Sequence, residues 1–238
     1  MARKKHNRGR AEISSKPRKR VSARSPNQKS VLQQISQNDI VFCAGPAGSG
    51  KTHLSVGAAI EYFLKNKVSR IVVTRPIVQV GERIGFLPGT AEQKLDPYLY
   101  PVFDEFRHFM SHDEIATHKN SRSIEIIPLA LMRGRNFHDA FIIGDEMQNA
   151  TFDQMKMLIT RMGMGSKLVV SGDLSQSDLD YRDQGAFQFC LEKLEIVEGV
   201  GISYLEKGDI VRNPIIPRIL DVLDDEVYDN SRHERTSR

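Results

Sequence analysis

From residue 28 onward, the chain alternates short β-branched apolar runs with longer stretches in which apolar residues recur at helical spacing. The short runs predict buried strands, and the longer stretches predict amphipathic helices. This alternation is typical of α/β proteins, in which a mostly parallel sheet carries helices on both faces. The predicted strands are 40–44, 70–74, 123–127, 140–144, 167–171 and 202–205, and the predicted helices are 27–36, 51–65, 97–109, 151–161, 185–194 and 214–223.

The apolar runs are too short to cross a bilayer, because a spanning helix needs about 20 apolar residues. The basic N-terminus is followed by no apolar stretch, so it does not resemble a secretory signal. Cys43 and Cys190 lie far apart, in an apolar run and a helical pattern, which favours buried thiols in a reducing compartment. We therefore expect a cytoplasmic protein of 238 residues with one main core and no membrane partner.

Basic side chains are concentrated at the N-terminus. Residues 1–24 hold ten Lys or Arg and a single acid, whereas the remaining chain carries 24 basic and 29 acidic side chains. Residues 1–24 contain few apolar groups, so we predict a disordered basic arm, followed by one domain over 25–225 and a frayed tail over 226–238. Two interpretations of the arm stay open: a solubilising segment, or one that binds the phosphate backbone of nucleic acid.

The strongest motif is Gly-x-x-x-x-Gly-Lys-Thr, which follows the predicted strand 40–44 and begins a predicted helix. In this setting the motif is a phosphate loop, whose backbone N–H groups surround the phosphates of a nucleotide. The lysine reaches the β- and γ-phosphates, and the threonine hydroxyl ligates Mg²⁺. We expect ATP and Mg²⁺ as ligands, with the nucleotide bound by Gly45, Pro46, Ala47, Gly48, Ser49, Gly50, Lys51, Thr52 and His53.

Acidic side chains follow the apolar strand 140–144 directly. Asp145 is expected at the carboxyl end of this buried strand, where ligands of open α/β sheets bind. We predict that Asp145 holds Mg²⁺ through water and that Glu146 acts as the general base, by accepting a proton from the attacking water or orienting it. A solvated loop is the alternative for an Asp-Glu pair, but the preceding strand and the phosphate loop favour a site.

A third strand, 167–171, is followed by Gly-Asp-Leu-Ser-Gln, which again places polar groups after a buried strand. Gln176 could hydrogen-bond the γ-phosphate or the attacking water and so report hydrolysis. An ordinary loop amide is the alternative for Gln176.

Six motifs, taken in order, resemble the PhoH-like ATPases over residues 25–222. The resemblance implies a three-layer P-loop NTPase fold with a single RecA-like domain, similar to the motor core of superfamily 1 helicases. It further implies ATP binding, hydrolysis, RNA-linked activity in some relatives, and assembly as rings. The motifs are Gly-Pro-Ala-Gly-Ser-Gly-Lys-Thr at 45–52, Val-Thr-Arg-Pro-Ile-Val at 73–78, the glycine-rich stretch 81–89, Phe-Ile-Ile-Gly-Asp-Glu-Met-Gln-Asn at 141–149, Ser-Gly-Asp-Leu-Ser-Gln at 171–176 and Asp-Ile-Val-Arg-Asn-Pro at 209–214.

The resemblance also implies roles for three residues outside the phosphate loop. Gln28 would read the adenine edge with its amide, the alternative being a helix-capping or surface amide. Arg75 would contact the nucleic-acid backbone or pair instead with Glu82. Arg212 would stabilise γ-phosphate charge, in its own subunit or across a ring interface as an arginine finger.

These features predict an Mg²⁺-dependent ATPase that couples hydrolysis to binding or remodelling of RNA or single-stranded DNA. The catalytic residues would be Lys51, Glu146, Gln176 and Arg212. Helicases of this class use two RecA-like domains and this chain has length for one, so we expect a homo-oligomeric ring, for example a hexamer. The alternative is an ATP-dependent binding or assembly switch with little turnover.

Overall fold

The computed structural model describes residues 19–77, 100–177, 179, 185–211, 215 and 219. Within these residues, the chain forms a six-stranded, all-parallel sheet in the order β3-β2-β4-β5-β1-β6. The sheet confirms the predicted α/β class. The strands are β1 Ile40–Ala44, β2 Arg70–Arg75, β3 Ile124–Pro128, β4 Ala140–Gly144, β5 Lys167–Gly172 and β6 Val200–Tyr204.

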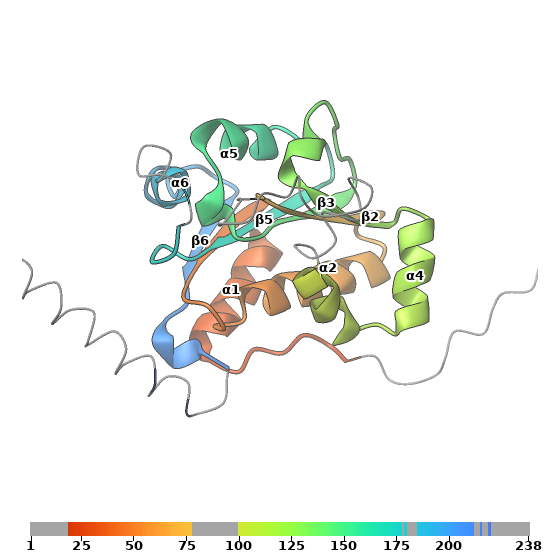
Figure 1. The fold of residues 1–238 in the computed structure, drawn as a ribbon, viewed down its shortest axis with the longest axis horizontal. Helices are drawn as coiled ribbons and strands as arrows, with labels where there is room; N and C mark the ends of the chain where they lie inside the picture. Colours follow the sequence, from red (N-terminus) through yellow and green to blue (C-terminus); the bar gives the residue numbers. More distant parts are fainter. Residues whose placement is uncertain are drawn as a thin grey trace, which may run out of the picture.

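Helices cover both faces of the sheet, which forms the middle of three layers (Figure 1). Helices α5 and α6 lie on one face, and α1, α2 and α4 lie on the other. Residues 100–107, on the α2 side, are also helical. The helices are α1 Pro26–Gln37, α2 Lys51–Leu64, α4 His112–Asn120, α5 Phe152–Ile159 and α6 Ala186–Lys193.

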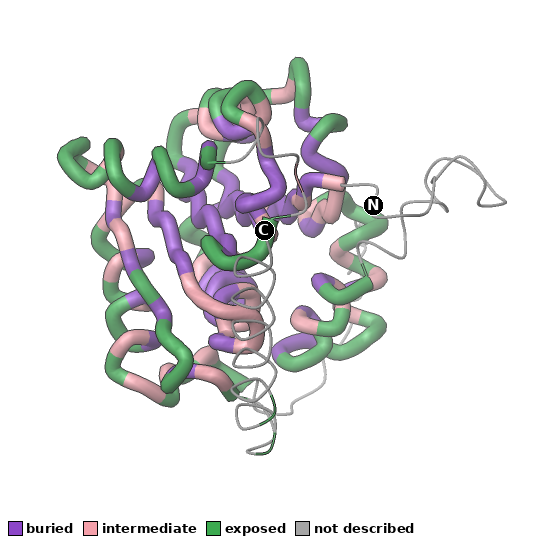
Figure 2. The backbone as a smooth tube through the Cα atoms, turned by 60° about the vertical axis from the view of Figure 1, so that its left-hand side comes forward, coloured by how far each residue is buried: buried purple, intermediate pink, exposed green. Residues whose placement is uncertain are grey.

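Successive residues of a strand pack into two separate hydrophobic cores, one on each face of the sheet, because side chains alternate between the two faces of a strand. In β1, Val41 and Cys43 pack toward α1 and α2, whereas Phe42 and Ala44 pack toward α5 and α6. Both faces are apolar, so every residue from Val41 to Ala44 is buried. Figure 2 shows that buried backbone is concentrated in the interior of the molecule, whereas exposed backbone lies around the outside. This two-sided burial explains why the strands appear in the sequence as continuous apolar runs.

Parallel pairing brings the carboxyl ends of four strands to one edge of the sheet. Ala44 of β1 is level with Gly172 of β5, and Thr74 of β2 is level with Gly144 of β4. The phosphate loop, the Asp-Glu pair and the Gly-Asp segment therefore begin at the same edge. The sheet order thus positions the candidate site.

Local capping signals explain where several helices begin. Ser25 caps α1 by accepting a hydrogen bond from the Gln28 amide, and Pro26 occupies the first turn. Helix α4, which our sequence interpretation missed, begins with a capping box between Ser111 and Glu114. It is mostly polar and buries only Ile115, so its apolar periodicity is weak.

The remaining secondary-structure predictions agree with the structure to within a few residues. Strand β6 begins at Val200, two residues before the predicted start. The predicted helix 97–109 is described from residue 100 onward, where residues 100–107 are helical and residues 108–109 form a turn. Most of the predicted helix 214–223 lies outside the described residues, as do residues 1–18 and the predicted tail 226–238.

The last residues of the predicted N-terminal arm differ from the prediction. Val21 packs against the α2-side core, and a β-carbon at Gly57 would lie 2.5 Å from its side chain. The Arg24 amide donates a hydrogen bond to Gln28 Oε1 at 2.8 Å. Residues 19–24 therefore belong to the folded body, where the prediction had placed the boundary after residue 24.

Cys43 and Cys190 are free, buried thiols. Burial raises the pKa of Cys43 to about 12 and the pKa of Cys190 to about 11, so both stay protonated at neutral pH. Separately, none of the helices in the described ranges combines the length and the apolar character that a bilayer crossing requires.

Candidate nucleotide site

The phosphate loop leaves β1 at Gly45 and turns into α2 at Lys51. Two of its glycines, Gly48 with φ 81° and Gly50 with φ 95°, adopt left-handed backbone that favours glycine. A β-carbon at Gly50 would also lie 3.1 Å from Gln28 Nε2. The loop therefore needs glycine at position 50 for its turn and for the close approach of Gln28.

Two buried side chains hold the inside of the loop. Lys51 is 8% exposed, and its ammonium donates hydrogen bonds to the carbonyls of Gly45 at 2.5 Å and Pro46 at 3.0 Å. Asp173, after β5, accepts a hydrogen bond from the Ala47 amide at 3.0 Å through Oδ2. These bonds hold the loop in one conformation, and a preformed loop lowers the ordering cost of ligand binding.

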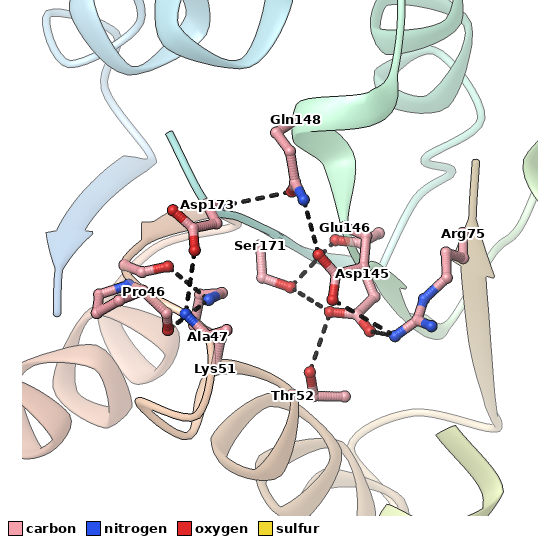
Figure 3. Close-up of polar contacts among 12 residues, drawn as sticks. Pro46, Ala47, Lys51, Thr52, Arg75, Asp145, Glu146, Gln148, Ser171 and Asp173 are labelled. Atoms are coloured by element: carbon pink, nitrogen blue, oxygen red, sulfur yellow. Dashed lines mark hydrogen bonds and ion pairs between the residues drawn. The ribbon is translucent and has the colours of Figure 1, made fainter. Parts of the chain in front are cut away.

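Asp145 lies at the centre of the site and is 1% exposed. Its Oδ1 accepts hydrogen bonds from the hydroxyls of Thr52 at 3.1 Å and Ser171 at 2.9 Å. Its Oδ2 accepts a hydrogen bond from Arg75 Nη2 at 2.7 Å, from the end of β2 (Figure 3). Carboxylate and hydroxyl oxygens are hard ligands that suit Mg²⁺. Asp145 and Thr52 could therefore hold the predicted cation.

Glu146 adopts a left-handed backbone conformation, with φ 52° and ψ 38°, which is uncommon for a non-glycine residue. Its carboxylate accepts a hydrogen bond from Gln148 Nε2 at 2.8 Å, and its other oxygen lies 3.7 Å from Arg75 Nη2. The side chain is 40% exposed. Glu146 is thus oriented by two neighbours while staying accessible to a water molecule.

Gln148 joins the Asp-Glu segment to the phosphate loop. Its Oε1 accepts a hydrogen bond from the Asp173 amide at 3.0 Å, while its Nε2 donates to Glu146. Asp173 in turn binds the Ala47 amide, so a continuous chain of hydrogen bonds runs from Glu146 to the loop (Figure 3). Gln148, Asp173 and Ser171 were not among the predicted site residues, although each lies within a motif that the sequence interpretation had identified.

A cavity of about 510 Å³ opens beside the phosphate loop. One part of its wall comes from α1 and the segment before it, and another from the helical residues 100–107 and the turn after them. Within this wall, His53 Nδ1 of α2 lies 3.0 Å from Glu105 Oε2 of the helical residues 100–107. The polar side chains that line the cavity are Ser22, Arg24, Gln28, Thr52, His53, Glu105 and His108.

Gln28 lines this cavity but is 3% exposed and already engaged through its amide. Nε2 donates to the Ser49 carbonyl at 2.9 Å, and Oε1 accepts from the Arg24 amide. The alternative of a surface amide is therefore excluded. In this conformation Gln28 braces the phosphate loop, and its reading of adenine stays a prediction.

Comparison with known proteins decides the family. The profile of the "PhoH-like protein" family matches residues 20–224. The chain belongs to the PhoH-like protein family. A PhoH-like protein of Synechocystis is 41% identical over 213 residues, covering 90% of this chain and 63% of the relative. A PhoH-like protein of Bacillus subtilis is 39% identical over 206 residues, covering 87% of this chain and 65% of the relative.

The PhoH-like chain spans about three fifths of the length of these relatives; for protein PhoH of Escherichia coli, with 38% identity, the covered share is 57%. Among solved structures, it is similar to the large terminase of a thermophilic bacteriophage, with TM-score 0.47, 14% identity and coverage of 81% of this chain and 48% of that one. It is also similar to the Pif1 helicase of Candida albicans, with TM-score 0.45, 18% identity and coverage of 86% and 44%.

The resemblance inferred from the motifs is therefore confirmed, and the chain is a P-loop NTPase with a three-layer fold. The structure brings four predicted residues of this PhoH-like protein together at the carboxyl edge of the sheet. They are Lys51, Thr52, Asp145 and Glu146.

The other three predicted residues of the PhoH-like chain differ in where they lie: Arg75 is in the site, Gln176 is in an exposed loop and Arg212 is outside the described residues. Gln176 lies in the loop after β5 with an exposed side chain. Arg75 pairs with Asp145, and its predicted alternative partner Glu82 lies outside the described residues. Arg212 also lies outside them, but the amide of its neighbour Val211 donates to the Gly48 carbonyl at 3.0 Å. The roles predicted for Gln176 and Arg212 are not tested by these contacts.

Proposed function

We propose that this protein is an Mg²⁺-dependent ATP hydrolase that couples turnover to binding or remodelling of RNA or single-stranded DNA, as a homo-oligomer. The observation that carries the hydrolase part is the meeting of Lys51, Thr52, Asp145 and Glu146 at one edge of the sheet. These groups come from segments up to about a hundred residues apart in sequence, and each suits one step of phosphoryl transfer.

The residues divide the chemistry as follows. The backbone N–H groups of the loop and the Lys51 ammonium bind the β- and γ-phosphates and offset their negative charge. Thr52 and Asp145 would hold Mg²⁺, and the cation would supply positive charge to offset the charge that develops on the phosphate oxygens. Glu146 takes a proton from water as the water oxygen bonds to the γ-phosphorus and the bond to the β-phosphate oxygen breaks. The products are ADP and inorganic phosphate.

The nucleoside end of ATP would enter the cavity beside the loop. The cavity borders Gly48, Gly50 and Thr52, so a nucleotide whose phosphates lie in the loop can extend directly into it. Its volume of about 510 Å³ lies within the range of about 300–1,000 Å³ that small-ligand sites occupy. Its mixture of imidazole, carboxylate, guanidinium and amide groups offers donors and acceptors to a base and a ribose.

The nucleic-acid part of the proposal is supported by the charge of the N-terminal arm and by the motif resemblance described above. Seven of the ten basic side chains in residues 1–24 lie in residues 1–18, and these would contact a phosphate backbone. Oligomer formation would let Arg212 of one subunit act on the γ-phosphate bound by its neighbour.

The deciding experiment is steady-state ATP hydrolysis with and without single-stranded RNA or DNA, using wild type, Lys51→Ala and Glu146→Gln. Lys65→Ala is the matched control, because Lys65 follows α2 and its side chain is 60% exposed. We expect strand-stimulated turnover in wild type and control, and a loss of about a hundredfold or more in Glu146→Gln.

Tight ATP binding with negligible and unstimulated turnover would contradict the hydrolase proposal and favour an ATP-dependent binding switch. The arm is tested by deleting residues 1–18 only, because residues 19–24 pack on the body. Reduced nucleic-acid affinity with a weaker salt dependence would support its role, and unchanged binding would refute it. Light scattering with and without ATP would measure the subunit number.

A further inference from the structure

Arg75 makes the shortest ion pair in the candidate site. It ends β2, and its side chain extends from that strand toward both acids of the Asp-Glu pair (Figure 3). Nη2 lies 2.7 Å from Asp145 Oδ2 and 3.7 Å from Glu146 Oε1. The Arg75 side chain is 18% exposed and that of Asp145 is 1% exposed, so this pair is largely removed from solvent.

The bonds of Asp145 account for both of its oxygens. Oδ1 faces the hydroxyls of Thr52 and Ser171, and Oδ2 faces the guanidinium of Arg75. A buried carboxylate without a counter-ion is costly, and a divalent cation at this carboxylate would place two further positive charges beside Arg75. Arg75 at Oδ2 and a cation held beside Thr52 at Oδ1 would therefore repel each other across the same buried carboxylate.

We infer that Arg75 is the counter-ion of Asp145 in the cation-free protein, and that Mg²⁺ takes over this carboxylate by displacing the guanidinium. Arg75 is thus a positioning residue of the metal site rather than a ligand. While it is paired with Asp145, Arg75 Nη2 already lies 3.7 Å from Glu146 Oε1, so a displaced guanidinium has a second carboxylate close by to pair with. The inference rests on the proposed metal site but does not depend on ATP hydrolysis.

The chemistry of arginine suits this exchange. Guanidinium stays charged at all relevant pH values, and its several N–H donors let it hold one carboxylate while a second lies nearby. Lysine offers a point charge on a more strongly hydrated ammonium and would hold the buried carboxylate less well. Strand β2 therefore ends in a residue that stabilises Asp145 until a cation arrives.

The test compares Arg75→Gln and Arg75→Lys with Arg135→Gln in the full chain. Arg135 is a matched control, because it pairs with Glu125 at the same 2.7 Å but outside the site. The first readout is Mn²⁺ binding to nucleotide-free protein, measured by electron paramagnetic resonance. We expect Arg75→Gln to tighten Mn²⁺ binding by about tenfold, the effect of removing one close competing charge. Arg75→Lys should give a smaller gain and Arg135→Gln none.

The second readout is the thermal midpoint in EDTA and again with Mg²⁺ and ADP. Arg75→Gln should be less stable than wild type in EDTA, and Mg²⁺ with ADP should remove most of that deficit because the cation replaces the missing charge. Arg135→Gln should show the same deficit in both conditions. If Arg75→Gln unfolds in EDTA but folds with Mg²⁺ and ADP, the exchange is also supported.

Mn²⁺ affinity that is unchanged or weaker in Arg75→Gln, with an equal thermal deficit in both conditions, would overturn the inference and leave Arg75 as a structural ion pair. Fluorescent ADP binding to wild type separates this result from failure of the proposed function. A wild type that binds no nucleotide would refute that function. The Mn²⁺ titration would still test whether Arg75 opposes cation binding at Asp145.

Discussion

The candidate site has two sides that are built differently. The side where we propose that Mg²⁺ binds, called the metal side, consists of Thr52, Asp145, Arg75 and Ser171. These residues lie at or directly after the carboxyl ends of β4, β2 and β5 or in the first turn of α2. The nucleoside side is the cavity wall, which is assembled from helices and loops rather than from strand ends. One side is fixed by sheet topology and the other by the packing of separate helices.

The two sides also differ in how far their ion pairs are buried. On the metal side, the pair of Arg75 with Asp145 is largely removed from water. On the nucleoside side, the pair of His53 with Glu105 leaves 39% and 28% of the side chains exposed. Buried pairs are costly to break, whereas exposed pairs contribute little to folding. We therefore expect substitutions on the metal side to affect stability, and those on the nucleoside side to affect mainly ligand binding.

The largest effect is expected for Asp145→Asn. The substitution leaves the guanidinium of Arg75 opposite a neutral amide in a buried setting, which should lower the free energy of unfolding by about 3–5 kcal/mol. Urea denaturation measures this loss. Asp104→Asn is the control, because its pair with Arg107 has the same 2.7 Å distance but is exposed. Equal losses in the two variants would remove the distinction between the two sides.

Gln28→Ala tests whether the Gln28 side chain, on the nucleoside side, contributes to the stability of the fold. The variant leaves the Ser49 carbonyl and the Arg24 amide without their side-chain partner, so we expect a loss of about 1–3 kcal/mol in unfolding free energy. Gln33→Ala, on the exposed face of the same helix, is the control. The affinity for ADP should fall together with the stability. A variant with wild-type stability would show that the phosphate loop does not depend on the Gln28 side-chain amide.

Glu105→Gln should change ligand binding more than folding. The pair with His53 is partly exposed, so the change in unfolding free energy should stay below about 1 kcal/mol. Isothermal titration with ADP should nevertheless show altered affinity, because both residues line the cavity. Unaltered affinity would show that the nucleotide does not reach this wall.

The smallest effect concerns pH and Asp209, which lies next to the nucleoside side. Burial would raise the pKa of Asp209, but hydrogen bonds from the Glu206 amide and from Ser25 and Asn27 together lower it below 3.8. The folded carboxyl titrates at lower pH than the unfolded one, so its contribution is present above pH 3.8 and is lost as the pH falls through the folded pKa.

Asp209→Asn removes this titration. Wild type should be more stable than the variant at neutral pH, and this difference in unfolding free energy should shrink in acid. Urea denaturation from about pH 7 to about pH 2 measures it, and a difference that grows in acid would contradict the assignment.

The same contrast explains what the sequence could predict. Strands β1, β4 and β5 are buried on both faces, so they appear as apolar runs, and the functional residues follow them directly. The motifs therefore predicted Thr52 and Asp145, but not Ser171 or the counter-ion role that we infer for Arg75. That role depends on β2 lying beside β4, which no local pattern specifies.

The nucleoside side could not be predicted in this way. Glu105 and His108 belong to no motif and reach the cavity only because residues 100–109 pack on α2. The early start of β6 was also hidden, because Gly201 looks like a loop residue. In the structure, the strand passes close to α1 at this point, and a β-carbon on residue 201 would displace the ends of the Gln34 and Asn38 side chains.

The left-handed backbone of Glu146 means that folding and catalysis make opposite demands on this position. A non-glycine residue held at φ 52° costs about 1 kcal/mol or more of folding free energy, and glycine would relieve that cost. Glycine would also abolish the proposed base. Random mutagenesis that selects only for thermal resistance should therefore enrich inactive chains at position 146, whereas selection for turnover should keep the strained glutamate.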